Sequence, residues 1–193
     1  MYAVIGLGNP KKEYQSTRHN AGFMFVDWLA GEFSKSLFTR KNTVTTDVTI
    51  SGQTVKLAKS LEMMNNSGTA VENLVDYFDI PPKNVIVVHD DIDIRLGTAK
   101  LVFARGSGGH NGVNSVITQL GTKGFCRLRL GIAPKESGEV DKPKFGKAGI
   151  SPYVLGRFTP DEKEILKDIF PQAKVAIEQL VSEGVEAAQN SLH

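Results

Sequence analysis

Apolar segments of strand length alternate along the chain with segments whose apolar residues recur at the spacing of a helix face. This alternation is typical of α/β proteins, in which helices cover a parallel or mixed sheet. The apolar runs predict strands over residues 2–7, 85–88, 98–104 and 125–132. We therefore expect one α/β domain over residues 1–193, a twisted mixed β-sheet flanked by helices.

Two further strands are predicted to form an antiparallel hairpin. Residues 43–50 and 53–58 alternate in polarity on either side of Ser51-Gly52. Glycine tolerates the positive φ that a tight hairpin turn requires. The hairpin makes the expected sheet mixed rather than wholly parallel.

Helices are predicted where helical spacing follows a capping residue. The first covers residues 20–33, and the second starts at Asn66 or Ser67 and stops at Ile80-Pro81-Pro82. A short helix is predicted over residues 113–120. These helices fill the connections between the predicted strands.

The C-terminal region is predicted to be helical from Thr159-Pro160-Asp161-Glu162, which is a capping box with proline at the first helical position. Pro171 is expected to kink or divide this region, because proline has no backbone N–H. The polar segment 134–149 is expected to be a mobile loop.

The composition excludes several classes of protein. A chain of 193 residues with 40% hydrophobic and 23% charged residues is neither disordered nor of low complexity. The 23 basic and 21 acidic residues leave a net charge of +2, so a polyanion would have to bind a local basic patch. Cys126 is the single cysteine, which excludes an internal disulfide and a cysteine-based zinc site. The chain starts directly with a predicted strand and has no apolar run of about 18 residues, so we expect a soluble, cytoplasmic protein with no membrane partner.

The most promising chemistry involves His19 and Asp90. His19 lies in a polar loop before the first helix, and Asp90 follows the apolar strand 85–88. In open α/β sheets the carboxyl ends of the strands border the crevice, so we expect these two side chains to meet. A histidine oriented by a carboxylate can act as a general base on water, which suits an activated ester better than an amide. Covalent catalysis is disfavoured, because Cys126 lies inside a predicted strand and no serine stands in a nucleophile elbow.

Three short patterns suggest other sites but lack essential residues. Gly6-x-Gly8 is followed by Lys11 rather than a third glycine, which disfavours a dinucleotide site. Residues 106–109 are glycine-rich but lack the ending of a nucleotide P-loop. Residues 90–93 contain three aspartates, but the internal histidines lack metal-ligand spacing, so no metal site is expected.

Asparagines and basic residues near these segments have two interpretations each. Several asparagines lie beside a glycine, a proline or a helix start, namely Asn9, Asn20, Asn65, Asn66 and Asn111. Asparagine is common at such positions because it caps helices and tolerates turns, but carboxamides that converge on a cleft would bind a peptide carbonyl or an oxyanion. Lys100 and Arg105 precede the glycine-rich segment, while Arg127 and Arg129 share one face of a strand. That face either contacts phosphates or is a solvated edge.

Taken in order, the motifs closely resemble those of bacterial peptidyl-tRNA hydrolase. The resemblance rests on Gly-Leu-Gly-Asn-Pro at 6–10, Thr-Arg-His-Asn-Ala-Gly at 17–22, Met-Asn-Asn-Ser-Gly at 64–68, His-Asp-Asp-Ile-Asp at 89–93, Gly-Ser-Gly-Gly-His-Asn-Gly at 106–112, Arg-Leu-Arg-Leu-Gly-Ile at 127–132 and Tyr-Val-Leu-Gly-Arg-Phe at 153–158. It implies hydrolysis of the ester that joins a peptide to the 3′-terminal ribose of tRNA. It also implies that no metal or organic cofactor takes part, and that the substrate partner is the acceptor stem and 3′ end of peptidyl-tRNA. A monomer is expected.

The resemblance also implies roles for individual residues. By this likeness His19 is the general base, Asp90 supports it, and Asn9 discriminates N-blocked from free aminoacyl groups. The positions implied to bind the substrate end are Tyr14, Met63, Asn65 and Asn111, with His110 as a neighbouring contact that transfers no proton. The residues implied to contact acceptor-stem phosphates are Lys100, Arg105 and Arg129.

Two features depart from the family pattern, and two other functions stay open. Residues 60–63, Ser-Leu-Glu-Met, replace a segment that usually contains proline and an aromatic residue, and Val102 stands where some members have lysine. One alternative is a non-catalytic RNA-binding relative with the same fold. The other is a peptidase or ordinary esterase, which would cleave small peptides or esters as well as the tRNA conjugate.

Overall fold

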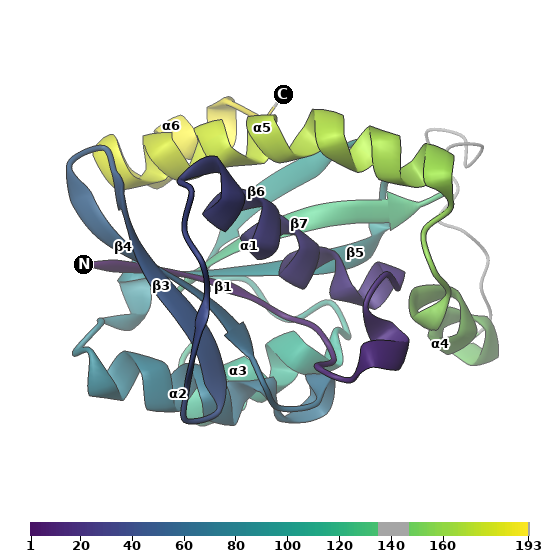
Figure 1. Ribbon diagram of the computed structural model, residues 1–193, viewed down its shortest axis with the longest axis horizontal. Coiled ribbons are helices and arrows are strands. Elements are labelled where there is room, and N and C mark those ends of the chain that lie inside the picture. Colours follow the sequence, from purple (N-terminus) through teal and green to yellow (C-terminus); the bar gives the residue numbers. More distant parts are fainter. Residues whose placement is uncertain (135–146, 193) are drawn as a thin grey trace.

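A seven-stranded mixed sheet forms the centre of the computed structural model, which describes residues 1–134 and 147–192 (Figure 1). In chain order its strands are β1 Tyr2–Gly6, β2 Phe38–Arg40, β3 Thr43–Ile50, β4 Gln53–Ser60, β5 Val85–Arg95, β6 Ala99–Phe103 and β7 Cys126–Ala133. Their order across the sheet is β2-β3-β4-β1-β5-β7-β6.

The central strands are parallel and the outer strands are antiparallel. β1 lies parallel to both β4 and β5, and β7 is parallel to β5. The outer pairs β2–β3, β3–β4 and β6–β7 are antiparallel. The predicted hairpin is present, with Ser51 and Gly52 at positive φ in its turn. The predicted α/β fold class with a mixed sheet is therefore confirmed.

Helices cover both faces of the sheet (Figure 1). They are α1 Ala21–Glu32, α2 Ser67–Tyr77, α3 Asn111–Leu120, α4 Lys147–Leu155, α5 Pro160–Ser182 and α6 Val185–Asn190. α1, α5 and α6 lie on one face, and α2 and α3 lie on the other. Short 3-10 helices at Lys12–Tyr14, Arg18–Asn20 and Met64–Asn66 precede α1 and α2.

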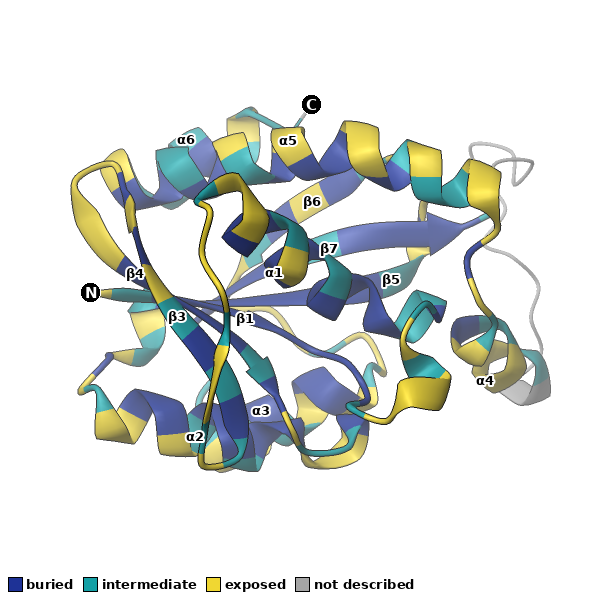
Figure 2. Ribbon diagram, in the orientation of Figure 1, coloured by how far each residue is buried: buried dark blue, intermediate teal, exposed yellow. Residues whose placement is uncertain are grey.

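Alternate residues of each central strand supply two cores. On β5, Ile86 and Val88 pack toward α1 and α5, while Val85 and Val87 pack toward α2 and α3. Because both faces are covered, the strand is apolar without alternation, which is the pattern that the sequence shows. Figure 2 shows these strands as buried, with exposed residues on the outer faces of the helices.

The structure differs from the sequence predictions at β5. The strand was expected to end at Val88, but it continues to Arg95, with a register shift between Asp91 and Arg95. Its polar residues continue the pairing with β7, because His89 lies opposite Arg129 and Asp90 lies opposite Leu130. Polar side chains here have partners inside the protein, so their polarity does not mark the end of the strand.

The C-terminal region also differs from the prediction. α5 continues through Pro171, so the expectation that this proline divides the helix is wrong. Phe170, Ala173 and Ile177 are buried on the face toward the sheet, and this packing offsets the hydrogen bond that proline cannot make. The predicted capping box of Thr159 and Glu162 is present.

The short elements β2 and α4 were not predicted from the sequence. The expected mobile loop over 134–149 lies largely outside the described residues, which resume at Lys147 in α4. No helix within the described ranges is both long and apolar enough to cross a membrane.

Candidate active site

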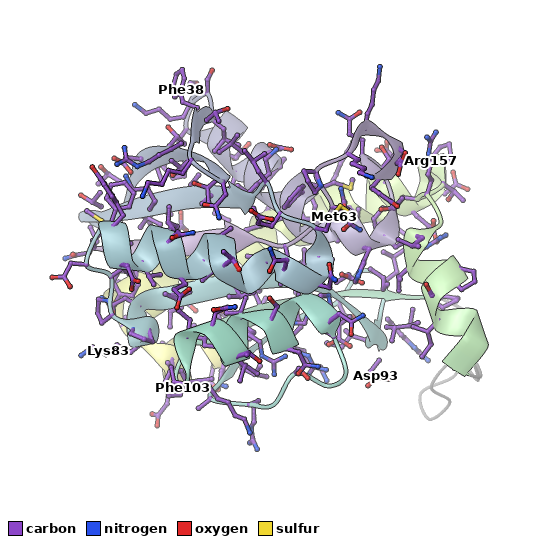
Figure 3. The ribbon with its side chains drawn as sticks, turned by 90° about the horizontal axis from the view of Figure 1, so that it is seen from below. Phe38, Met63, Lys83, Asp93, Phe103 and Arg157 are labelled. Carbon is purple, nitrogen blue, oxygen red and sulfur yellow. The ribbon has the colours of Figure 1, made fainter. Side chains whose placement is uncertain are left out.

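A pocket of about 500 Å³ opens at the carboxyl edge of the parallel strands, where α1, α2 and α3 begin. Its walls include the loops after β1 and β4, the polar part of β5, the loop before α3, and α4. Figure 3 shows Met63 and Asp93 at this end of the molecule, and Lys83 and Phe103 at the opposite end. This placement is the one expected for a site in an open α/β sheet.

His19 and Asp90 meet in this pocket, as expected. The Nδ1 atom of His19 lies 2.9 and 3.0 Å from the two carboxylate oxygens of Asp90. Asp90 is buried in β5, whereas His19 lies on the 3-10 turn before α1 and is partly exposed. Because Asp90 is an acceptor, Nδ1 of His19 carries the hydrogen, which leaves the Nε2 lone pair available.

A second histidine, His110, binds the same carboxylate. His110 is the N-cap of α3, and its Nδ1 accepts a hydrogen bond from the Val113 N–H. Its Nε2 therefore donates to Asp90 Oδ1 at 3.0 Å. The rings of His19 and His110 lie 5.0 Å apart, so the fold brings together histidines that are distant in sequence.

The contact between His19 and Asp90 shifts the pKa values of both groups. Burial alone would lower the pKa of His19, but the charge of Asp90 and its hydrogen bond outweigh burial, so the pKa of His19 is raised above 6.5. Burial alone would raise the pKa of Asp90, but His19 and His110 hold it well below the ordinary value. Asp90 is therefore ionised at neutral pH and strengthens His19 as a base.

A third histidine, His89, lies behind His110 and is buried. Its Nδ1 donates to the backbone oxygen of Asp90 at 2.6 Å, and its ring packs against His110 at a centroid distance of 4.6 Å. Burial, together with the charges of His110 and Arg127, lowers the pKa of His89 well below the ordinary value. His89 is thus a neutral part of the support for the site.

Arg127 is buried, although the sequence suggested a phosphate contact. Its guanidinium donates to the Gly106 oxygen at 2.6 Å and lies 3.5 Å from Nε2 of His89. Since the side chain is occupied inside the protein, Arg127 is not available to phosphate. Sequence spacing placed Arg127 and Arg129 on the same face, but it could not show that the loop before α3 covers Arg127.

Asn9 projects a hydrogen-bond donor at the edge of the pocket. Its Oδ1 accepts a hydrogen bond from the Met64 N–H at 2.9 Å. The Asn20 side chain accepts from the backbone N–H of Asn9 and donates to its backbone oxygen. Within the described residues, Nδ2 of Asn9 has no hydrogen-bond acceptor. The carboxamide can therefore donate to a carbonyl oxygen, while its own oxygen is already engaged by the Met64 N–H.

The other residues expected to bind the substrate also line the pocket. Asn65 and Asn111 stand at the starts of the segments that lead into α2 and α3, and both are exposed. Their side chains make no hydrogen bond to the part of the chain that the structure describes. Tyr14 and Met63, both partly exposed, line the same pocket. All the side chains expected at the catalytic and substrate-end positions thus converge here.

The basic residues expected to bind phosphate do not line the pocket. Lys100 is exposed on β6 directly opposite Arg129 on β7, and Arg105 is exposed in the loop before α3. Arg129 donates to Asp91 at 2.7 Å in an ion pair that is partly buried. Lys100 and Arg105 are therefore freer to meet an anion than Arg129 is.

One wall of the pocket was missed by sequence reasoning. It consists of residues from α4, namely Ile150, Ser151, Val154 and Leu155. Arg18, the neighbour of His19, contacts this wall by stacking on the Tyr153 ring, and it also pairs with Glu162 of α5 at 2.8 and 2.9 Å. The apolar spacing around Val154 and Leu155 could have suggested a helix, but nothing in it indicated contact with His19.

One group of described residues, His19, Asp90 and His110, brings its donor atoms within 4.8 Å of one another, as a metal site would require. The same atoms already hydrogen-bond to one another, so a metal ion would have to displace the hydrogens on the two histidine nitrogens that bond to Asp90.

Attack by a cysteine thiol has little support. Burial raises the pKa of the Cys126 thiol to about 11, and Cys126 lies in β7 away from the pocket lining. The geometry therefore favours a base acting on water over attack by a thiol.

Comparison with known proteins gives consistent matches over the whole length of the chain. The sequence model of the family described as Peptidyl-tRNA hydrolase matches residues 3–193. The peptidyl-tRNA hydrolase of Geobacillus kaustophilus is 43% identical over 94% of this chain and 93% of its own, and that of Alkaliphilus metalliredigens is 37% identical over 98% of each. A crystal structure of peptidyl-tRNA hydrolase from Acinetobacter baumannii matches with a TM-score of 0.88 at 30% identity, covering 100% of this chain and 94% of that one.

Proposed function

The chain belongs to the peptidyl-tRNA hydrolase family and is an ester hydrolase of peptidyl-tRNA. We propose that His19 is its general base and that Asp90 orients the His19 ring and raises its pKa. The observation that carries this assignment is the contact of Nδ1 of His19 with both oxygens of Asp90. This contact leaves Nε2 as the basic atom on the pocket side. His110 shares the carboxylate and transfers no proton.

In the proposed reaction, Nε2 of His19 takes a proton from a water molecule. The hydroxide oxygen bonds to the ester carbonyl carbon, and the carbonyl oxygen becomes negative. The bond to the ribose oxygen then breaks, and the proton on His19 passes to that oxygen. The products are the free 3′-terminal ribose hydroxyl and a peptide carboxylic acid, which releases its proton to the solvent and becomes a carboxylate. Asp90 stabilises the imidazolium between the two proton transfers of His19.

Asn9 is proposed to stabilise the oxyanion and to select the substrate. Its Nδ2 is the free donor, because Oδ1 is held by the Met64 N–H. A donor fixed in this way stabilises negative charge as it develops on the carbonyl oxygen. The same donor is mismatched to the ammonium group of a free aminoacyl ester, which favours N-blocked substrates.

The nucleotide end is proposed to bind at the neighbouring wall. Asn65 and Asn111 offer carboxamides, and Tyr14 and Met63 offer flat or flexible surfaces to the terminal base. Both α2 and α3 begin at the pocket, so their positive ends favour a phosphate group there. Acceptor-stem phosphates, which carry no sequence information, would bind to Lys100 and Arg105. Arg129 would join them once its ion pair with Asp91 opens.

The organisation and location of the protein complete the proposal. We propose one domain over residues 1–193 that acts as a monomer in the cytoplasm, with no membrane partner. The matches support catalysis and give no support to a non-catalytic RNA-binding function. The preference for a tRNA conjugate over small esters or peptides rests on the phosphate and nucleotide contacts above.

A turnover assay tests these roles. Wild-type protein should release tRNA from N-acetylaminoacyl-tRNA, cleave free aminoacyl-tRNA far more slowly, and leave small acyl esters largely intact. His19→Ala should still bind the tRNA conjugate but lose about 100-fold or more of its turnover. Full turnover by His19→Ala would overturn the assignment of the base, and equal cleavage of small esters would overturn the proposed tRNA contacts.

A further inference from the structure

We propose that Arg127 and His89 form a buried anchor for the loop Gly106–Gly109, and that Arg127 is a positioning residue for the reaction. The inference depends on the site proposed above, because this loop ends at His110 and forms part of the pocket wall. It concerns residues that do not line the pocket themselves. The anchor holds the pocket wall from the side of the sheet.

The loop has little packing of its own. Its sequence is Gly-Ser-Gly-Gly, and residues 105, 106, 108 and 109 are exposed. Gly108 and Gly109 both have positive φ, which is a conformation that glycine adopts easily but does not fix. The internal bonds from Gly109 to Ser107 Oγ and from His110 to the Ser107 oxygen are 3.2 and 3.3 Å long. The loop therefore needs a contact from outside to hold one shape.

Arg127 supplies that contact from the sheet. Its bond to the Gly106 oxygen is 2.6 Å long, and the residue is only 4% exposed. Within the described ranges, no carboxylate is bonded to this guanidinium. Burying a cation without a bonded carboxylate is costly, and an apolar residue would be cheaper at this position. The hydrogen bond to the loop at Gly106 explains why a charged donor occupies this position.

His89 extends the anchor to the reacting groups. Arg127 can donate only, so the contact at 3.5 Å requires Nε2 of His89 to be unprotonated. Nδ1 of His89 then carries the hydrogen that is donated to the Asp90 oxygen at 2.6 Å. The His89 ring packs edge-on against His110, which in turn binds the Asp90 carboxylate. One guanidinium thus fixes both the loop and the tautomer of the ring behind His110.

The first experiment replaces Arg127 by Met, which keeps an unbranched apolar stem and removes every donor. Arg127→Met should lower kcat/KM for N-acetylaminoacyl-tRNA by about 10- to 100-fold, because small displacements of a pocket wall are costly in rate. Arg127→Lys should lose less. The control is Lys83→Met, which also removes one positive charge but lies at the opposite end of the molecule (Figure 3); its kcat/KM should stay at the wild-type value.

Chemical rescue distinguishes positioning from general damage. Millimolar guanidinium chloride, compared with sodium chloride at equal ionic strength, should restore part of the activity of Arg127→Met and none in the Lys83→Met control. Wild-type kcat/KM in folded Arg127→Met, or a loss that guanidinium does not reduce, would overturn the proposal.

A second measurement does not depend on activity, and its main result comes from the wild-type protein. Long-range ¹H–¹⁵N spectra of the wild-type protein should show His89 protonated at Nδ1 and unprotonated at Nε2. In Arg127→Lys, the Nε2 signal of His89 should shift while that of His19 stays in place. A hydrogen on Nε2 of wild-type His89 would rule out the Arg127 contact, even if His19 proves to be the base.

Discussion

His19 and Asp90 are 71 residues apart in the chain, yet Nδ1 of the histidine lies within 3.0 Å of both carboxylate oxygens. The contact joins the turn that starts α1 to the buried part of β5. It fixes Nδ1 as a donor and leaves the lone pair of Nε2 unused in a residue that lines the pocket. The assignment of His19 as the base rests on this arrangement.

The free donor of Asn9 predicts how an isosteric change would act. Asn9→Asp keeps an oxygen for the Met64 N–H but replaces the Nδ2 donor by a negative oxygen. We expect kcat on N-acetylaminoacyl-tRNA to fall about 100-fold, the usual effect of losing one oxyanion donor. The ratio of kcat/KM for N-blocked over free aminoacyl-tRNA should also shrink, because a carboxylate attracts the free ammonium group.

Asn73→Asp is the matched control for this change in charge. Asn73 is exposed on α2 and does not line the pocket, so both kinetic quantities should remain at their wild-type values. An unchanged substrate ratio in Asn9→Asp would show that selection of N-blocked substrates lies elsewhere.

Close approach of α2 and α3 predicts a sharp difference between two glycines. A Cβ added at Gly68 would overlap the backbone oxygen of Ser115, whereas a Cβ at Gly31 in α1 would meet nothing within 4 Å. Gly68→Ala should lower the free energy of unfolding by about 1–3 kcal/mol, since overpacking forces the helices apart. Gly31→Ala should raise it by about 0.5–1 kcal/mol, because alanine is the better helix former.

Chemical denaturation measures both changes. Equal effects of the two substitutions would contradict the described packing of α2 against α3.

Binding and chemistry should respond differently to salt. The phosphate contacts proposed for Lys100 and Arg105 predict that KM for peptidyl-tRNA rises steeply with ionic strength, because counterions compete for these residues. The single-turnover rate at saturating substrate should change little, since His19 and Asp90 are shielded in the pocket. Steady-state and single-turnover kinetics over a series of sodium chloride concentrations separate the two effects. Equal salt sensitivity of both quantities would refute this division of roles.

The sequence predicts the strands better than the exact limits of the site. Apolar runs locate β1, β5 and β7 because both faces of each are buried, and the turn Ser51-Gly52 locates the hairpin. The end of β5 could not be predicted, because the partners of its polar residues come from distant parts of the chain. The same reason explains why the sequence left Arg127 open between a phosphate contact and a solvated edge, whereas the residue is buried and bonded to the Gly106 oxygen.

The residues of the candidate site could be predicted from the sequence, but most contacts between them could not. The likeness of motifs located the residues from Asn9 to Asn111 that gather around His19. It did not show that Asn20 holds the backbone of Asn9, or that His110 and His19 share Asp90. It included residues 153–158, which overlap α4, but it did not show that this helix forms a wall of the pocket. Such contacts depend on packing between elements and have no signal in local sequence.

The pH dependence of the single-turnover rate, measured alongside the NMR titration of the His19 ring, tests the central claim most directly. A base works in its neutral form, and the pKa of His19 is raised above 6.5 by Asp90, so the rate should fall as the pH drops through a midpoint above 6.5 that coincides with the ring titration. Asp90→Asn removes the charge that raises this pKa while burial, which lowers it, remains; both midpoints should move together to lower pH, and the plateau rate should fall. A rate midpoint that differs from the His19 titration, or that stays in place in Asp90→Asn, would contradict the account.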